Sequence, residues 1–159
     1  KNHYRAAATT VVTHKKTGKR IFFIATHGPL KEVANTNAGR LLVEFDQTYN
    51  KAGLPTIVVG DMNARPGKAF HNIMCEYFED SFLVAKENCG TIGTYNSSRE
   101  VEKNFSAPHR RIDHIYVHST DKGKFAVKNY KVYRDKYEVD GKKNYPADHN
   151  PVVVDLKLK

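Results

Sequence analysis

The chain has 159 residues, 40% of them hydrophobic and 27% charged, which is enough for one small domain with a core. This composition excludes a disordered protein, and no apolar run approaches the ~20 residues of a membrane helix. The net charge of +9 makes polyanions candidate partners, although the scattered basic residues also fit an ordinary basic surface.

The two cysteines, Cys75 and Cys89, do not have the spacing of a metal site. A disulfide between them would fit an exported protein, and two buried thiols would fit a cytoplasmic one. The sequence leaves the compartment open between these two alternatives.

The beginning of the chain predicts a β-hairpin that leads to a histidine. Residues 6–13 and 20–25 have the pattern of two strands joined by a turn at 15–19. The second strand is apolar on both faces, so we expect it inside a covered sheet, with His27 directly after its end.

Two helices are predicted, one on each side of a short buried strand at residues 56–59. The first covers 37–51, with Asn37 as its N-cap and an apolar stripe of Ala38, Leu41, Leu42, Phe45 and Tyr49. The strand ends in Gly60-Asp61-Met62-Asn63, and the apolar face of the second helix consists of Phe70, Ile73, Met74, Tyr77 and Phe78.

The second half contains a long irregular segment and three more strands. Residues 88–108 could bind a ligand through Thr94, Tyr95 and Asn96, or could form a solvated surface loop. Strands are predicted at residues 111–118, 125–133 and 152–158. The order β-β-α-β-α-loop-β-β-β indicates an α/β protein in which a mixed β-sheet is layered with helices.

Acidic residues stand at three strand ends, as Asp61, Asp113 and Asp148, and His149 follows the last of them. Carboxylates without a Cys/His cluster favour Mg²⁺, Mn²⁺ or Ca²⁺, and an imidazole can move a proton near neutral pH. Each aspartate taken singly could instead cap a turn. For Arg110 and Arg111, a phosphate contact is weighed against a solvated or ion-paired face, and His71 and His114 are interpreted as surface or packing residues.

Four short motifs together resemble the endonuclease/exonuclease/phosphatase superfamily, which has the deoxyribonuclease-I-like fold. They occur in the family's order and approximate spacing: Thr26-His27, Gly60-Asp61-Met62-Asn63, Arg111-Ile112-Asp113-His114-Ile115 and Asp148-His149-Asn150-Pro151-Val152. The resemblance runs from about Arg5 to Leu158. It implies a four-layer sandwich of which this chain is the second half.

The resemblance also implies a role for each matching residue. His149 would be the catalytic imidazole, Asp61 would position or deprotonate the attacking water, and Asn63 would hold a phosphate oxygen. Asp113 would support the site and His27 would contact the phosphate. The expected reaction is a metal-dependent, in-line hydrolysis of a phosphodiester or phosphomonoester, with a nuclease slightly favoured. The ion would be Mg²⁺, or else Mn²⁺ or Ca²⁺, and its ligands would be Asp148, Asp61 and Asn63.

The chain departs from the family in lacking an earlier strand that ends in a metal-binding Glu. We therefore expect residues 1–159 to form a single, incomplete domain whose apolar sheet needs a missing N-terminal half or a second chain to cover it. By itself this chain is expected to bind metal poorly and to have little activity. The alternative is a non-catalytic module that binds phosphate or nucleic acid and lacks a complete metal site.

Overall fold

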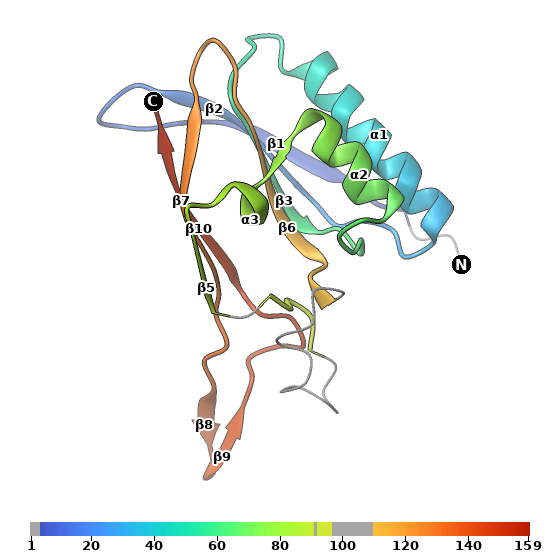
Figure 1. Cartoon of the computed structure of the whole chain (residues 1–159), viewed down its shortest axis with the longest axis vertical. Helices are drawn as coiled ribbons and strands as arrows, with labels where there is room; N and C mark the ends of the chain where they lie inside the picture. The colour runs from blue at the N-terminus through green and yellow to red at the C-terminus, as the bar shows by residue number, and fades with distance from the viewer. Residues whose placement is uncertain (1–3, 91, 97–109) are drawn as a thin grey trace.

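The computed structural model describes residues 4–90, 92–96 and 110–159 (Figure 1). Its helices are α1 (Glu32–Tyr49), α2 (Ala69–Tyr77) and α3 (Ser81–Val84). Its strands are β1 (Ala7–Thr13), β2 (Arg20–Thr26), β3 (Thr56–Asp61), β4 (Glu79–Asp80), β5 (Glu87–Gly90), β6 (Asp113–His118), β7 (Phe125–Val132), β8 (Tyr137–Val139), β9 (Lys142–Asn144) and β10 (Val152–Leu158).

The larger sheet has five strands in the order β1-β2-β3-β6-β4. β2 and β3 are parallel, with α1 in the crossover between them, whereas β3 and β6 are antiparallel. Because parallel strands end at the same edge of a sheet, His27 and Asp61 come together there. The β3–β6 ladder ends at that edge with Asp61 opposite Asp113. A mixed sheet with helices packed on it confirms the predicted fold class.

Helix α1 begins at Glu32, so the predicted start at Asn37 is wrong. The preceding Lys31 is extended, and its side chain does not cap the helix. Instead, the Asn35 amide in the first turn donates to the carbonyls of Pro29 (2.9 Å) and Met62 (2.7 Å). These contacts with the loops after β2 and β3 fix the beginning of the helix, which explains why local capping rules failed.

The buried face of α1 also differs from the predicted apolar stripe. Leu42 is buried, but Leu41 is 61% exposed and Tyr49 is 62% exposed. The helix instead buries Asn35, Gly39 and Asp46. The carboxylate of Asp46 accepts hydrogen bonds from the Thr56 hydroxyl (2.6 Å) and the Tyr77 hydroxyl (2.9 Å), so the burial of this charge is compensated. A hydrophobic periodicity cannot reveal such a polar contact face.

Helices α1 and α2 lie side by side on one face of the larger sheet (Figure 1). As predicted, α2 directs Phe70, Met74 and Phe78 inward. These side chains pack with apolar residues of α1 and of the sheet in the main core, whose fully buried members include Ile24, Val58 and Met62. The side chains of β2 alternate between this core and the opposite face of the sheet, as expected for a strand covered on both sides.

The second sheet has the strand order β10-β7-β5. Val127 of β7 and Leu156 of β10 pack with Ile57 and Val117 of the larger sheet in a second apolar cluster. The expectation that the larger sheet lacks a partner layer is therefore wrong for this part of its face. Beside this cluster, an apolar cavity of about 770 Å³ opens along β1 and β2. That a further segment or a second chain covers it stays a prediction.

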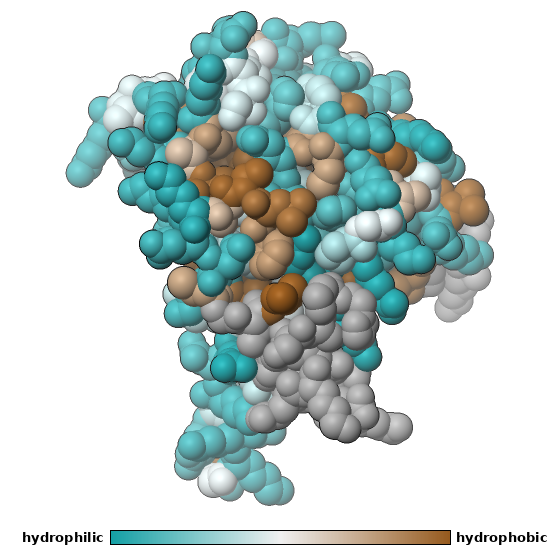
Figure 2. All heavy atoms as spheres, viewed as in Figure 1, coloured by the Kyte–Doolittle hydropathy of each residue, from teal (hydrophilic) through white to brown (hydrophobic). Residues whose placement is uncertain are grey.

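Several connecting elements refine the sequence prediction. Residues 81–84 form the short helix α3, which was not predicted from the sequence. Between the strands predicted at 125–133 and 152–158, the exposed β8–β9 hairpin projects away from the sheets (Figure 1). Figure 2 shows apolar side chains gathered near the centre of one face, in the region of α3, where Leu83 and Val84 are exposed.

Two expectations concern the compartment. No helix in the described part of the chain is long and apolar enough to cross a membrane. Cys75 and Cys89 carry free thiols and both are exposed, so the alternative of two buried thiols is wrong, and the pair does not form a disulfide in this structure. The choice between an exported and a cytoplasmic protein stays open.

Candidate active site

The edge where β3 ends brings together most of the residues that the sequence singled out. Asp61 is the last residue of β3, Asp113 is the first residue of β6, and His27 directly follows β2. His149 reaches the same place from the segment that precedes β10. Chain direction thus places these four side chains at one edge, although they are far apart in the sequence.

The imidazole of His149 lies between two carboxylates. Its Nδ1 atom is 2.8 Å from Oδ2 of Asp113 and 3.1 Å from Oδ1, so it donates to this carboxylate. Its Nε2 atom is 3.9 Å from Oδ2 of Asp61, which is beyond hydrogen-bonding distance. Asp113 therefore fixes the orientation and tautomer of the ring, while Nε2 is left available to another group.

The two oxygens of Asp61 have different environments. Oδ1 accepts a hydrogen bond from the backbone N–H of Asn63 (2.8 Å), which holds the carboxylate in one orientation. Oδ2 points toward Nε2 of His27 (3.3 Å) as well as toward His149. Nδ1 of His27 in turn accepts from the guanidinium of Arg5 (3.1 Å). Oδ2 of Asp61 is thus the carboxylate oxygen that faces both imidazoles.

Asn63 follows in a left-handed backbone conformation, with φ 47°, which asparagine tolerates better than most residues. Its side-chain amide donates to the carbonyl of Gly28 (3.0 Å), and the N–H of Gly28 donates to the carbonyl of Asp61 (2.7 Å). These reciprocal bonds tie the loop after β2 to the loop after β3. Asn63 therefore stands beside Asp61 with its amide oxygen directed by this pairing.

Two glycines allow these loops to approach each other. A Cβ atom on Gly60, whose φ is +149°, would overlap the carbonyl oxygen of Thr26. A Cβ atom on Gly28 would overlap the carbonyl oxygen of Met62. Both positions need the absence of a side chain, because any larger residue would separate His27 from Asp61.

A buried segment fastens the strand that begins with Asp113 to the segment that carries His149. The hydroxyl of Thr94 accepts from the backbone N–H groups of Ile112 (3.1 Å) and Asp113 (3.0 Å). The N–H of Asn96 donates to the carbonyl of Asp148 (2.6 Å). Since Thr94 and Asn96 are almost completely buried, the hypothesis that they present polar groups to a ligand is wrong. The rest of the predicted ligand-binding loop, residues 97–108, lies outside the described residues.

The electrostatics of this site favour a protonated His149. Burial by itself lowers the pKa of His149, but the hydrogen bond to Asp113 and the negative charges of Asp113, Asp61 and Asp148 outweigh this effect. The net result is a pKa raised above the ordinary value of 6.5. His149 therefore keeps its proton up to a higher pH than a solvated imidazole does.

Asp61, Asp113 and His149 also offer ligand atoms within 4.8 Å of one another, as a metal ion requires. The two carboxylates suit a divalent cation such as Mg²⁺ or Mn²⁺, which prefers oxygen ligands, whereas the imidazole already donates to Asp113. Asp148 is not part of this group. Asp148 is exposed, and its backbone carbonyl accepts from the N–H of Asn96. Its role as a metal ligand therefore stays a prediction. The same holds for Asn63.

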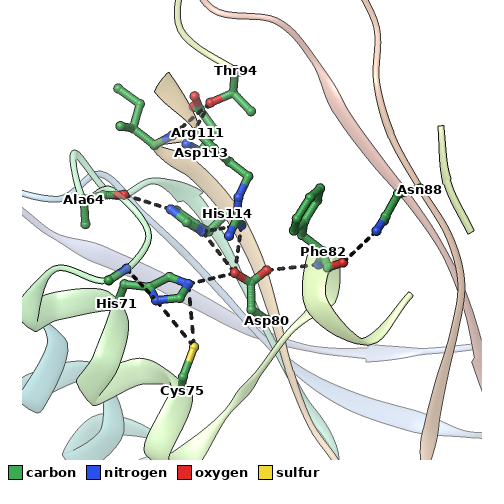
Figure 3. Close-up of polar contacts among 12 residues, drawn as sticks. Ala64, His71, Cys75, Asp80, Phe82, Asn88, Thr94, Arg111, Asp113 and His114 are labelled. Carbon is green, nitrogen blue, oxygen red and sulfur yellow. Dashed lines mark hydrogen bonds and ion pairs between the residues drawn. The ribbon is translucent and has the colours of Figure 1, made fainter. Parts of the chain in front are cut away.

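Behind the site lies a second, fully buried polar cluster centred on Asp80 (Figure 3). Oδ2 of Asp80 accepts from Nε2 of His71 (2.9 Å) and from the guanidinium of Arg111 (2.8 Å). Nε2 of His114 donates to the carbonyl of Ala64 (2.8 Å), and its Nδ1 accepts from Arg111 (3.0 Å). The cluster therefore binds β6, which begins with Asp113, to the loop that follows Asn63.

The charges within this cluster are opposed and paired. Burial alone would raise the pKa of Asp80, but its polar contacts with His114 and His71 and the positive charge of Arg111 hold it well below its usual range. Burial lowers the pKa of His114, which is neutral with its proton on Nε2. His71, Asp80 and His114 could in principle bind a metal. The Arg111 guanidinium already lies among these donors, however, so the cluster is an ion-paired core.

Three residues beside the site were either given no role from the sequence or left open between a ligand contact and a surface position. Arg65, Tyr95 and Arg110 line a cavity of about 410 Å³ that also reaches His149. The ring of Tyr95 is 5.0 Å from that of His149, and the Arg110 guanidinium lies 5.5 Å above the Tyr95 ring. The sequence offered only a Tyr within a polar loop and a pair of adjacent arginines as signals for them. Arg111, the other arginine of that pair, is buried and ion-paired, as one of its alternatives proposed.

Comparisons with solved structures support this architecture. A mannosyl-6-phosphatase of Bacteroides thetaiotaomicron VPI-5482 is 26% identical, with a TM-score of 0.79 over 96% of this chain and 57% of its own. The human Nocturnin catalytic domain with a bound sulfate anion is 19% identical, with a TM-score of 0.64 over 98% of this chain and 53% of its own. A humanized D. rerio TDP2 is 15% identical, with a TM-score of 0.71 over 96% of this chain and 61% of its own.

This chain thus spans less than two thirds of each of these three structures. No curated protein matches it in sequence. The model of the Endonuclease/Exonuclease/phosphatase family matches residues 3–149, which include each of the four motifs at the strand ends at least in part. With the motifs, the sheet topology and the family model in agreement, the chain belongs to the Endonuclease/Exonuclease/phosphatase family.

Proposed function

We propose that the protein is a metal-dependent phosphoesterase and that His149 is its catalytic imidazole. The observation that carries this proposal is the position of His149, whose Nδ1 is held by Asp113 at 2.8 Å while Nε2 faces Asp61 at 3.9 Å. An imidazole fixed on one side and available on the other suits proton transfer or a hydrogen bond to a phosphoryl oxygen. Membership of the family supports hydrolysis of a phosphoester bond as the reaction class.

In this proposal, each side chain at the sheet edge has one task. Oδ2 of Asp61, which is not used by Asn63, positions the attacking water and takes its proton. The water oxygen attacks phosphorus in line with the leaving oxygen, so one P–O bond forms while the other breaks, and no covalent enzyme intermediate arises. His149 and His27 contact phosphoryl oxygens, and the Asn63 side chain supports one of them.

The carboxylates of Asp61 and Asp113 fit a divalent cation, and Mg²⁺ is the ion we propose, with Mn²⁺ and Ca²⁺ as alternatives. His149 lies in the same group but is kept for the phosphate. When bound, such an ion would neutralise negative charge on the phosphoryl group. Asp148 and Asn63 are proposed as further ligands or as residues that support the ligands. Since Mg²⁺ prefers six ligands, these donors would share the ion with water or with residues of a longer protein.

Two observations bear on the substrate. The net charge of +9 favours a polyanion and therefore a nuclease. The similarity to a mannosyl-6-phosphatase supports a small phosphomonoester instead. We retain the nuclease as the slightly favoured interpretation, and we propose that a further segment or a second chain completes the domain and helps to select the substrate.

The test is hydrolysis by the full-length protein of bis(p-nitrophenyl) phosphate and of p-nitrophenyl phosphate, with Mg²⁺ and with EDTA. We expect Mg²⁺-dependent turnover of at least one substrate and a loss of at least 100-fold in kcat for His149→Ala, as for the removal of a general acid or base. His14→Ala is the matched control, because His14 is exposed in the β1–β2 turn.

A rival function is a module that binds phosphate or nucleic acid without cleaving it. It would be supported if the protein bound an oligonucleotide or inorganic phosphate while neither chromogenic substrate was hydrolysed under any metal condition. Turnover that is equal in the wild type and in His149→Ala would also refute the assignment of the catalytic imidazole.

A further inference from the structure

Two cavities meet at His149, and they differ in charge. One cavity, of about 410 Å³, is lined by Asp61, Asp113 and His149 among other residues. The other, also of about 410 Å³, is lined by Arg65 and Arg110 and also reaches His149. Among the described residues that line this second cavity, none is acidic. His149 thus borders one cavity with carboxylates and another with guanidinium groups.

The two arginines of the second cavity are available to a ligand. Arg65 is exposed, and Arg110 is half-buried. Within the part of the chain that the structure describes, neither guanidinium forms an ion pair with a carboxylate. Two guanidinium groups around one cavity repel each other, and a bound anion would offset this repulsion.

Tyr95 sets the distance between this positive charge and His149. It forms a β-bridge with His149, and its backbone N–H donates to the carbonyl of Arg110 (3.1 Å). The centroid of its ring lies 5.0 Å from that of the imidazole, and the Arg110 guanidinium lies 5.5 Å from the centroid of the same ring. Tyr95 thus connects the arginine to the imidazole. Leu30 and Ile112 add apolar surface to the cavity lining.

We propose that this cavity, defined by Arg65, Tyr95 and Arg110, binds a second phosphate group of the substrate that is not cleaved. The inference rests on the proposed function, in which the scissile phosphate lies at His149. Guanidinium groups bind phosphate through paired, charge-assisted hydrogen bonds, and the tyrosine ring offers a face to the sugar that joins the two phosphates. A volume of about 410 Å³ falls within the range of small-molecule pockets. The recognised unit is thus a sugar that carries two phosphate groups, as in a nucleotide unit or a sugar bisphosphate.

The test measures binding, separately from turnover. Isothermal titration calorimetry on the full-length protein in EDTA would compare thymidine 3′,5′-bisphosphate with thymidine 5′-monophosphate, and glucose 1,6-bisphosphate with glucose 6-phosphate. In at least one pair we expect the bisphosphate to bind about tenfold more tightly, as expected for one additional charge-assisted contact. The pair that shows the preference distinguishes a nucleoside carrier from a simple sugar.

Arg110→Gln and Arg65→Gln should each reduce this preference to less than about threefold, whereas Arg40→Gln should leave it unchanged. Arg40 is the matched control because it is exposed on α1, where it donates to Asn37. If Arg110→Gln does not fold, as circular dichroism would show, the exposed Arg65 still decides the question. Equal binding of the two members in both pairs would overturn the proposal, and so would a preference that survives both substitutions.

Hydrolysis of the chromogenic substrates separates this inference from the proposed function. A bisphosphate preference that depends on Arg65 and Arg110 supports the phosphate cavity even if the full-length protein hydrolyses nothing. Turnover that depends on His149, without any preference between mono- and bisphosphates, overturns the cavity assignment and leaves the proposed function in place.

Discussion

Replacing Asp80 by Asn tests whether the buried cluster behind the site stabilises the fold. Asp80 is 2% exposed, and its Oδ2 atom contacts both Nε2 of His71 and the guanidinium of Arg111. Asparagine has nearly the same size and can still accept the hydrogen bond that the N–H of Phe82 donates to Oδ1 at the start of α3 (3.0 Å). The substitution therefore removes the negative charge and leaves most other contacts in place.

The expected loss is large, because Arg111 would be left buried without its counter-charge. Removing one partner of a buried ion pair costs about 3–5 kcal/mol. Whole domains have unfolding free energies of only about 5–15 kcal/mol. With a urea m-value of about 2 kcal/mol per M, the midpoint of unfolding should fall by about 2 M in Asp80→Asn.

The same contact predicts a dependence of stability on pH. Burial lowers the pKa of His71, but the hydrogen bond to Asp80, with a further contribution from Cys75, raises it from 6.5 to about 9. The stabilisation is thus fully present below pH 6.5 and is lost as the pH rises through 9. This shift corresponds to about 3 kcal/mol, and most of the dependence should disappear in Asp80→Asn.

The assay is urea unfolding at pH 6 and pH 9.5, followed by far-UV circular dichroism because the chain contains no tryptophan. Asp155→Asn is the matched control, since the Asp155 carboxylate accepts only an exposed hydrogen bond, from Asn129 (3.0 Å), among the hydrogen bonds described for it. This substitution should change the unfolding free energy by less than about 0.5 kcal/mol. A loss of under about 1 kcal/mol in Asp80→Asn, or an equal loss in both variants, would refute the assignment of the cluster as a stabilising ion pair.

Three further predictions concern the site itself. Gly60→Ala should lower the unfolding free energy by at least about 2 kcal/mol, because the new Cβ would overlap the Thr26 carbonyl. Gly18→Ala is the control: Gly18 has a φ of +68° but open space around it, so the substitution should cost about 1 kcal/mol. Equal losses in thermal unfolding would contradict this reasoning. Asp113→Asn should lower the pKa of His149, because it removes the main charge that raises it, and an imidazole NMR titration that is unchanged would disprove the coupling. In the chain of 159 residues, Mn²⁺ bound near Asp61 and Asp113 should broaden the NMR signals of the adjacent His149. Binding should be weak, since two carboxylates supply few of the ligands that the ion needs, and tight stoichiometric binding would contradict the expected incomplete metal site.

The sequence predicted which side chains meet at the sheet edge better than it predicted the limits of the neighbouring helix, for a physical reason. Asp61 ends β3, Asp113 begins β6 and His149 lies shortly before β10, and strand direction then determines which strand ends meet. The apolar patterns of these strands were strong enough to place their ends approximately. Few alternatives remain once the strands are assigned, so short motifs were sufficient.

The polar residues inside the molecule could not be predicted in this way. Asn35 and Asp46 on α1, and Asp80 before α3, are buried because each meets specific partners from distant segments. Hydropathy assigns polar residues to the surface and apolar residues to the core. The predicted stripe of α1 therefore omitted the buried polar residues and included the exposed Leu41 and Tyr49. Only the tertiary structure identifies partners that compensate a buried charge.

The end of the β3–β6 ladder has a consequence for how this protein can change. Asp61 and Asp113 are direct cross-strand partners, and like charges in that position destabilise a sheet. A selection for thermal robustness alone would therefore favour neutral residues at these two positions and would erase the proposed chemistry. Under the proposed function, this pair therefore exchanges some stability of the sheet for the chemistry at its edge.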